Sequence, residues 1–280
     1  MLNLNGTLTD QTTETSLLQN RGLHYGDAVF ETLKVSAGKI LFWEDHYFRL
    51  MASMRILRME IPMNFTMEFL EAEIQKTIAS FPKDVAQRVK LLVWRSWGGT
   101  YTPASQQVDF AIFAAPLQHP FYVLSEEPYE VELFKDHYVN SGLLSTIKSN
   151  NRAINVLGSI FAQENGYANC LLLNEHKMVV EALNGNLFWV KDYKIKTPPL
   201  SDGCLQGILR KQIGSILSQL PDYVLEEDSI SPFDLQKADE LFITNTIVGI
   251  QPITQYRKKS FGNAVAKELV GKLNAKARLG

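Results

Sequence analysis

Two prolines near the middle of the chain, Pro116 and Pro120, restrict its fold more than any other sequence feature. Proline cannot donate a backbone hydrogen bond and holds φ near −65°, so two prolines this close together interrupt a regular element. Strand-like and helix-like segments alternate on both sides, and 280 residues suffice for two cores. We therefore predict an α+β protein of two domains, 1–117 and 123–280, joined by a linker at 118–122.

Composition excludes several classes of function. The 28 lysines and arginines nearly balance the 30 aspartates and glutamates, so the net charge of −2 gives no support for binding nucleic acid. Cys170 and Cys204 are the only cysteines, which excludes a disulfide scaffold and a thiolate metal site. The five histidines are too scattered to pair as metal ligands on a helix, so we expect no metal. The chemistry must come from few residues or from a cofactor.

The first residues, MLNLNGTLTDQTTETS, lack the basic region and the continuous apolar stretch of a secretory signal. No window of the sequence approaches the roughly 18 apolar residues that suggest a membrane span. We therefore expect a cytoplasmic protein that binds no membrane.

Hydrophobic periodicity predicts alternating strands and helices in the first half of the chain. Pro62 ends the first helical pattern, and Thr66 is placed to cap a second helix. The loop at 98–103 connects two neighbouring strands and is a predicted wall of a pocket. The predicted strands are 29–35, 40–42, 88–97 and 108–115, and the predicted helices are 43–58 and 67–78.

The pattern changes to shorter strands in the second half. Asn165 and Gly166 are placed to end one helix, and a turn around 174–177 joins two strands. The predicted strands are 131–133, 135–139, 170–173, 178–181, 186–190 and 240–244, and the predicted helices are 152–163, 207–217 and a terminal helix after Gly262.

Lys148 has three interpretations. It stands three residues after Ser145, and Ser-x-x-Lys is the motif of penicillin-recognising acyl transferases, although the partner Lys-Thr-Gly motif is missing. It also lies between an apolar run and a predicted helix, where partial desolvation would lower its pKa and favour Schiff-base formation. The third interpretation is an ordinary solvated lysine, and position alone does not decide among the three.

Other residues have the chemistry to bind a charged cofactor. Glu181 ends an apolar run, where a carboxylate is costly to bury without a partner, and it could be the counter-charge of a cationic ring. Gly207 precedes a predicted helix, whose first amides could converge on a phosphate. Arg49 and the polar run 244–246 could supply further phosphate contacts. A surface or turn role is the alternative for each.

Several of these residues lie in short segments that follow one another in a recognisable order. The segments are 20–32 (NRGLHYGDAVFET), 46–50 (HYFRL), 148–152 (KSNNR), 181–188 (EALNGNLF), 197–198 and 207–210 (GILR). Together they resemble the class IV aminotransferases, the fold-type-IV enzymes that use pyridoxal phosphate. The family includes branched-chain and D-amino acid aminotransferases and 4-amino-4-deoxychorismate lyases. The resemblance implies the D-amino acid aminotransferase-like fold, with the active site in the interdomain cleft.

The resemblance also implies the role of each residue toward pyridoxal 5'-phosphate. Lys148 would form a Schiff base with the cofactor and move protons at the substrate α-carbon, which makes it the catalytic residue. Glu181 would hydrogen-bond the pyridine nitrogen and keep the ring protonated. Family members often have threonine where this chain has Leu209, so that only the backbone amide is left there. The remaining implied cofactor-binding residues are Arg49, Asn186, Gly207, Ile208 and Thr246.

Individual residues within the resemblance bear on which reaction the chain is expected to catalyse. Asn151 and Arg152 match the lyase form of the segment after Lys148, and Ala153 stands where branched-chain enzymes have a tyrosine. Thr100, however, stands where lyases and D-amino acid enzymes tend to have an arginine for a substrate carboxylate. We expect an aminotransferase acting on an amino acid and a 2-oxo acid. The lyase that releases pyruvate and 4-aminobenzoate is the alternative, and a non-catalytic binding protein is a third reading.

The substrate side is the least specified part of the expected site. Family members are homodimers or larger, so the resemblance implies a homodimer, and nothing in the sequence names the substrate. The candidate substrate-binding residues are Tyr25, Lys34, Arg95, Thr100 and Tyr101.

Overall fold

The computed structural model describes residues 2–9 and 20–279. Part of the segment considered above for a secretory signal, residues 10–16, lies outside these ranges. Contacts divide the chain into two compact units. The N-terminal unit comprises the chain up to Phe121 and the separate segment Ile147–Asn151. The C-terminal unit comprises Tyr122–Thr146 and the chain from Arg152 onward.

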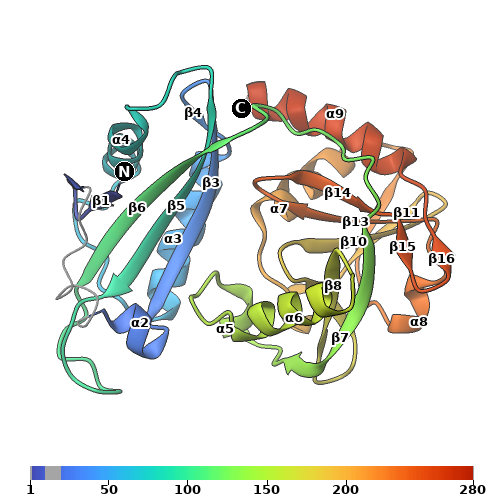
Figure 1. The fold of residues 1–280 in the computed structure, drawn as a ribbon, viewed down its shortest axis with the longest axis horizontal. Helices are drawn as coiled ribbons and strands as arrows, with labels where there is room; N and C mark the ends of the chain where they lie inside the picture. The colour runs from blue at the N-terminus through green and yellow to red at the C-terminus, as the bar shows by residue number, and fades with distance from the viewer. Residues whose placement is uncertain (1, 10–19, 280) are drawn as a thin grey trace. The chain divides into compact units, whose positions relative to one another are not determined.

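An antiparallel sheet forms the N-terminal unit, and in the described residues its strand order is β2-β1-β6-β5-β3-β4. Helices α3 and α4 cover one face of this sheet (Figure 1) and share its apolar core. The strands are β1 Leu2–Leu4, β2 Thr7–Thr9, β3 Ala28–Ser36, β4 Lys39–Ile40, β5 Ala86–Arg95 and β6 Val108–Leu117. The helices are α2 Arg21–Tyr25, α3 Trp43–Ile56 and α4 Met67–Ile78.

Successive side chains of β3 point to opposite faces of the sheet, so its core residues and its lysine lie on different faces. Val29, Leu33 and Val35 are buried in the core beneath α3 and α4. Phe30, Thr32 and Lys34 therefore belong to the opposite face, where Thr32 pairs with Lys90 of β5 and Lys34 pairs with Arg88. The sheet thus has one apolar face and one face with a row of cations.

The two predicted helices of this unit are confirmed. Helix α3 begins at Trp43 as predicted and ends at Ile56, two residues before the predicted end. Helix α4 begins at Met67, and the Thr66 side chain accepts a hydrogen bond from the Phe69 amide as its N-cap.

The replacement Thr66→Ala should lower the free energy of unfolding by about 1 kcal/mol, because it leaves one amide of the first turn of α4 without its acceptor. Urea unfolding followed by circular dichroism measures this change. The matched control is Thr102→Ala, at an exposed threonine of the same unit. Equal stability of the two variants would show that the cap contributes nothing.

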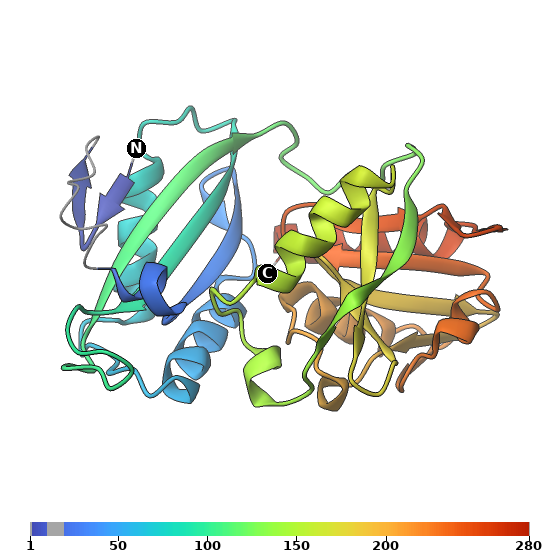
Figure 2. The same cartoon turned by 60° about the horizontal axis from the view of Figure 1, so that its bottom comes forward.

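Two five-stranded sheets form the C-terminal unit in the described residues, ordered β12-β11-β10-β13-β14 and β16-β15-β7-β8-β9. Helix α6 lies against β7 and β8, and α7 and α9 lie against the first sheet (Figures 1 and 2). The strands are β7 Glu130–Val139, β8 Asn169–Asn174, β9 Val179–Ala182, β10 Asn186–Lys191, β11 Lys194–Thr197, β12 Val224–Glu227, β13 Glu240–Asn245, β14 Gly249–Ile253, β15 Gln255–Tyr256 and β16 Lys259–Ser260. The helices are α5 Leu143–Thr146, α6 Ala153–Glu164, α7 Ile208–Leu217, α8 Pro232–Leu235 and α9 Ala264–Leu279, with a 3-10 turn at Leu200–Asp202.

Two predicted boundaries are wrong. Pro116 does not end regular structure, because β6 continues through it to Leu117 and pairs it with Gln87. This end of β6 tolerates a proline because β1 pairs with β6 only as far as Phe113, so that one side of the strand is an edge. In addition, a single strand β7 replaces the two strands predicted at 131–133 and 135–139, and its pairing with β8 is irregular after Phe134.

Neither a membrane span nor a metal cluster occurs in the described residues. No helix within 2–9 and 20–279 is long and apolar enough to cross a bilayer. Over the same ranges, no three histidine, cysteine or acidic side chains gather as metal ligands. Cys170 and Cys204 are unpaired, and burial raises the pKa of the Cys170 thiol to about 11 and that of Cys204 to about 12.

Candidate functional site

Lys148 belongs to the short segment Ile147–Asn151 that joins the N-terminal unit. Ile147 is buried in the core of that unit. The Lys148 carbonyl accepts a hydrogen bond from the Phe30 amide at 2.9 Å, and Ser149 forms a bridge with Val29. The segment therefore runs beside the start of β3, and the Lys148 ammonium lies 4.7 Å from the centre of the Phe30 ring.

The acyl-transferase interpretation of Ser145 and Lys148 is not supported by the hydrogen bonding of the serine. A nucleophilic serine must give its proton to a base. The Ser145 hydroxyl instead donates to the Gly142 carbonyl at 2.7 Å, within the first turn of α5.

Arg49 of α3 forms a buried ion pair with Glu31 of β3. The guanidinium donates from Nε to Glu31 Oε1 at 2.8 Å and from Nη2 to Oε2 at 2.5 Å. His46, one helical turn earlier, donates from Nδ1 to Glu31 Oε2 at 2.6 Å. Burial opposes ionisation of Glu31, but Arg49 and His46 outweigh it and lower its pKa to about 2. One edge of the Arg49 fork therefore faces Glu31, and any anion must approach another edge.

The opposite face of the β3–β5 sheet carries the cations. Lys34 is only 3% exposed and donates to the Phe121 carbonyl at 3.2 Å, and burial lowers its pKa to about 8. Lys90 lies over the same ring as Lys148, 4.6 Å from the centre of Phe30. Burial and the nearby Arg88 lower the pKa of Lys90, which has no ion-pair partner among the described residues. The sequence-based candidates do not include Lys90, although its alternation with Arg88 on one strand is visible in the sequence.

Arg95 is fully engaged within its own unit. Its donors reach both carboxylate oxygens of Asp27, the carbonyls of Leu57 and Arg58, and the side-chain oxygen of Gln106. These five bonds use all five N–H groups of a guanidinium. Arg95 therefore has no donor left for a substrate, and its predicted substrate contact gives way to a structural role.

Arg21 holds the loop that carries Thr100 and Tyr101. It donates to Asp27, and also to the carbonyls of Gly98 at 3.0 Å and Thr100 at 2.8 Å. The Tyr101 side chain is 91% exposed, and its ring centre lies 5.9 Å from that of Tyr25. The structure thus places three predicted substrate residues, Tyr25, Thr100 and Tyr101, near one another at one loop.

Glu181 lies at 7% exposure in β9, and hydrogen bonds hold its carboxylate. Its Oε2 accepts from the Leu205 amide at 3.0 Å and from Asn186 Nδ2 at 3.4 Å. Asn186 Nδ2 also donates to the Leu205 carbonyl at 2.8 Å. Asn186 therefore links Glu181 of β9 to the segment that leads into α7.

The N-terminus of α7 begins where this segment ends. Gly207 is the N-cap and no side chain caps the helix there, so the amides of Ile208 and Leu209 have no intrahelical acceptor. A Cβ at Gly207 would lie 1.8 Å from the Asn186 amide oxygen, so a larger residue there would displace the Asn186 side chain. The Leu209 side chain is buried, which leaves its amide as the group available to an anion.

The turn between β13 and β14 carries Thr246. The Tyr122 hydroxyl donates to the Thr246 carbonyl at 3.1 Å, and Asn245 Oδ1 accepts from the amides of Ile247 and Val248. Thr244, just before the turn, pairs with Asn186 across the sheet. Its buried hydroxyl has no hydrogen-bond partner among the described residues, and such a group is normally satisfied by a ligand or water.

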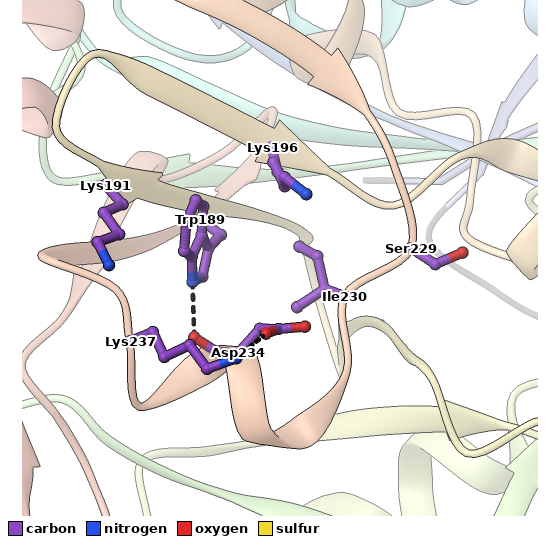
Figure 3. A pocket seen from close by; sticks show the side chains of 7 residues that line it. All are labelled: Trp189, Lys191, Lys196, Ser229, Ile230, Asp234 and Lys237. Atoms are coloured by element: carbon purple, nitrogen blue, oxygen red, sulfur yellow. Dashed lines mark hydrogen bonds and ion pairs between the residues drawn. The ribbon is translucent and has the colours of Figure 1, made fainter.

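A hollow of about 160 Å³ lies elsewhere in the C-terminal unit (Figure 3). Two of its three lysines are already paired, because Lys196 contacts Asp228 at 2.5 Å and Lys237 contacts Asp234 at 2.8 Å. The Trp189 indole N–H on its wall donates to the Asp234 carbonyl. No predicted site residue lines the hollow, which makes it a poor candidate for the site. Its lining residues are Trp189, Lys191, Lys196, Ser229, Ile230, Asp234 and Lys237.

In the C-terminal unit, the Leu205 backbone amide and the Asn186 side chain thus connect the Glu181 carboxylate to the segment before the N-terminus of α7. A carboxylate suits a ligand with a cationic N–H group, and a helix N-terminus suits a phosphate. The N-terminal unit, taken by itself, carries Lys148, Arg49 and the partly buried cations Lys34 and Lys90. These donors suit a ligand that carries a carbonyl and carboxylates.

Comparison with known proteins identifies the family of this chain. The family model "Amino-transferase class IV" matches residues 28–256 of this chain. The chain is 28% identical over 241 residues to the aminodeoxychorismate lyase of Vibrio harveyi, with 85% of this chain and 86% of that protein covered. It is also 28% identical over 262 residues to the D-alanine aminotransferase of Listeria monocytogenes serotype 4b, with 90% and 86% covered.

A solved structure shares the fold. The branched-chain aminotransferase of the thermophilic archaeon Thermoproteus uzoniensis, solved with norvaline, superposes with a TM-score of 0.84 at 25% identity, covering 99% of this chain and 93% of that chain. The predicted α+β fold of the fold-type-IV aminotransferases is therefore confirmed. Since the family model spans most of the sequence, this chain belongs to the class IV amino-transferase family.

Proposed function

We propose that this chain binds pyridoxal 5'-phosphate and transfers an amino group between an amino acid and a 2-oxo acid. The observation that carries the proposal is the connection of Glu181, through Asn186, to the segment before α7. The Asn186 side chain and the Leu205 backbone amide thereby connect a carboxylate that would bind the ring nitrogen to a helix N-terminus that would bind the phosphate. The buried Thr244 hydroxyl and the glycine at Gly207 are consistent with a ligand at this place.

Each residue would hold one part of the cofactor. Lys148 Nζ is the amine for its aldehyde carbon, and Glu181 would accept the N–H of the pyridine ring. The amides of Ile208 and Leu209 would donate to the phosphate, together with Thr246 and the edge of Arg49 that does not face Glu31. The bound cofactor supplies an electron sink for the bond that breaks at the substrate α-carbon.

The chain's own groups would then perform the proton chemistry. Lys148, once displaced from the cofactor by the substrate amine, would remove and return the proton at the substrate α-carbon. Glu181 would hold a proton on the ring nitrogen throughout. Lys148 and Lys90 both lie over the Phe30 ring, and Lys90 would be a partner for a substrate carboxylate.

Lys34 gives this proposal a pH signature. Because burial lowers its pKa to about 8, Lys34 is charged below pH 8 and becomes neutral as the pH rises through 8. If Lys34 binds a substrate carboxylate, KM should rise about tenfold between about pH 7 and about pH 9. The variant Lys34→Met should lack most of this rise. The exposed Lys39→Met is the control, and identical KM profiles for both variants would contradict the role of Lys34.

The lyase is the second candidate, favoured by Asn151 and Arg152 after Lys148 and by the similarity to the Vibrio harveyi enzyme. One pair of assays separates the two reactions. The protein is loaded with pyridoxal phosphate and given amino donors with 2-oxoglutarate, or 4-amino-4-deoxychorismate alone. Transfer of the amino group to the oxo acid supports the aminotransferase. Release of pyruvate and 4-aminobenzoate without any oxo acid would reject it in favour of the lyase.

We further propose that the active protein is a cytoplasmic homodimer, as the family resemblance implies. Light scattering coupled to size-exclusion chromatography should give twice the chain mass of 31.7 kDa. A monomer that retains full turnover would contradict the dimer.

A further inference from the structure

Tyr122 is the first residue of the C-terminal unit and lies in the expected linker. Its side chain is only 3% exposed, and its hydroxyl donates to the Thr246 carbonyl at 3.1 Å. Burial raises the pKa of the phenol, so the hydroxyl keeps its proton and remains a donor. A residue 124 positions earlier in the sequence thus contacts the turn that carries a proposed phosphate ligand.

Two neighbours hold Tyr122 in place. Asn274 of α9 accepts from the Tyr122 amide at 2.9 Å and donates to its carbonyl at 2.8 Å. The Tyr122 ring packs onto Gly249 at the start of β14, where a Cβ would lie 2.6 Å from the ring. Gly249 also has φ +88, a conformation that side chains other than glycine rarely adopt. The ring therefore contacts Gly249, where the turn ends, and the hydroxyl contacts Thr246 within the turn.

The Thr246–Ile247 peptide is consequently held at both ends. Its carbonyl accepts from the Tyr122 hydroxyl, and its N–H donates to Asn245 Oδ1 at 3.1 Å. A peptide group is planar, so bonds at both ends determine its orientation. Because this peptide follows the Cα of Thr246, its orientation constrains ψ of Thr246 and so the backbone from which the Thr246 side chain and its hydroxyl project.

We propose that Tyr122 is a positioning residue whose hydroxyl orients the Thr246–Ile247 peptide and so presents Thr246 to the cofactor phosphate. The inference rests on the proposed binding of pyridoxal phosphate and goes beyond it, because Tyr122 itself contacts no part of the cofactor in this role. The linker thereby contributes to cofactor affinity through the turn.

The test compares two tyrosine-to-phenylalanine variants. Tyr122→Phe keeps the ring on Gly249 and removes only the hydroxyl, so the Kd for pyridoxal phosphate should rise about three- to tenfold. The Kd for pyridoxal, which lacks the phosphate, should not change. The matched control is Tyr256→Phe, because Tyr256 is fully buried and its hydroxyl has no hydrogen-bond partner among the described residues. Titrations followed by visible absorbance measure both constants.

A double-mutant cycle with Thr246→Ala sharpens the test. In that background, Tyr122→Phe should cause no further loss of pyridoxal phosphate affinity, since the group that it positions is gone. The role of Tyr122 would be overturned if Tyr122→Phe weakened the binding of pyridoxal phosphate and of pyridoxal equally, or weakened neither. It would also be overturned if Tyr122→Phe caused its full loss of pyridoxal phosphate affinity in the Thr246→Ala background. If the wild-type protein binds no pyridoxal phosphate, the proposed function fails and this inference fails with it. If the Kd for pyridoxal phosphate rises in Tyr122→Phe but not in Tyr256→Phe, the inference is supported and the proposed binding of pyridoxal phosphate stands.

Discussion

The variant Lys148→Ala should lose turnover by at least about a thousandfold, the largest effect expected for any single substitution in this chain. In the proposed function, Lys148 both attaches the cofactor covalently and transfers the proton at the substrate α-carbon. Proton transfer by a side chain alone contributes a factor of about 10²–10⁴ to the rate. Steady-state assays with the preferred substrate pair measure this loss.

The control for Lys148 is a lysine outside the site. Lys135 of β7 is exposed, so Lys135→Ala should keep wild-type turnover. Thermal unfolding of both variants checks that the Ile147–Asn151 segment still packs against β3 when the Lys148 side chain is removed. Turnover of Lys148→Ala within tenfold of wild type, with a normal unfolding midpoint, would exclude Lys148 as the catalytic residue.

The variant Glu181→Gln should retain the cofactor but lose about a hundredfold or more in kcat. The carboxylate favours the protonated ring by roughly 1–3 pKa units, and a neutral amide removes that preference. Glutamine keeps the volume and an oxygen that can accept from the Leu205 amide, so the local structure should persist. The Kd for pyridoxal phosphate should therefore change far less than kcat.

Glu164→Gln is the matched control, because Glu164 is an exposed glutamate at the end of α6 in the same unit. It should leave both kcat and cofactor affinity unchanged. An unaltered kcat in Glu181→Gln would contradict the assignment of Glu181 to the ring nitrogen. A large loss of cofactor affinity with normal kcat at saturation would assign Glu181 to binding alone.

Elements with strong local signals were predictable from the sequence. The apolar spacing and acidic first turn of Trp43–Ile56, and the cap at Thr66, are local features that tertiary contacts did not override. Strands β11 and β12, by contrast, were not predicted. Each has only four residues, and they pair in parallel across the intervening helix α7. Pairing of such short strands depends on partners distant in the sequence.

Residues of the candidate site could be proposed from the sequence only where a motif specified them. The resemblance assigns roles to Lys148 and Glu181, and these roles stay predictions. The engagement of Arg95 could not be predicted, because its main partner Asp27 lies 68 positions away and local sequence gives no sign of the pair. Tertiary contacts decide whether an arginine is buried with a carboxylate. Only the folded structure therefore shows how many N–H groups of Arg95 are already used.

Lys90 differs from Arg95, because its sequence pattern is visible locally but does not by itself indicate a function. Its alternation with Arg88 on β5 is visible in the sequence, but solvated cations are common on strands. Only the position of both Lys90 and Lys148 over the Phe30 ring makes Lys90 a candidate site residue.

Covalent trapping of the cofactor tests the central claim most directly. The protein is incubated with pyridoxal phosphate, reduced with borohydride, digested and mapped by mass spectrometry. We predict one modified peptide, with the reduced cofactor on Lys148. Absence of any modification, or attachment to another lysine while Lys148 remains unmodified, would contradict the account.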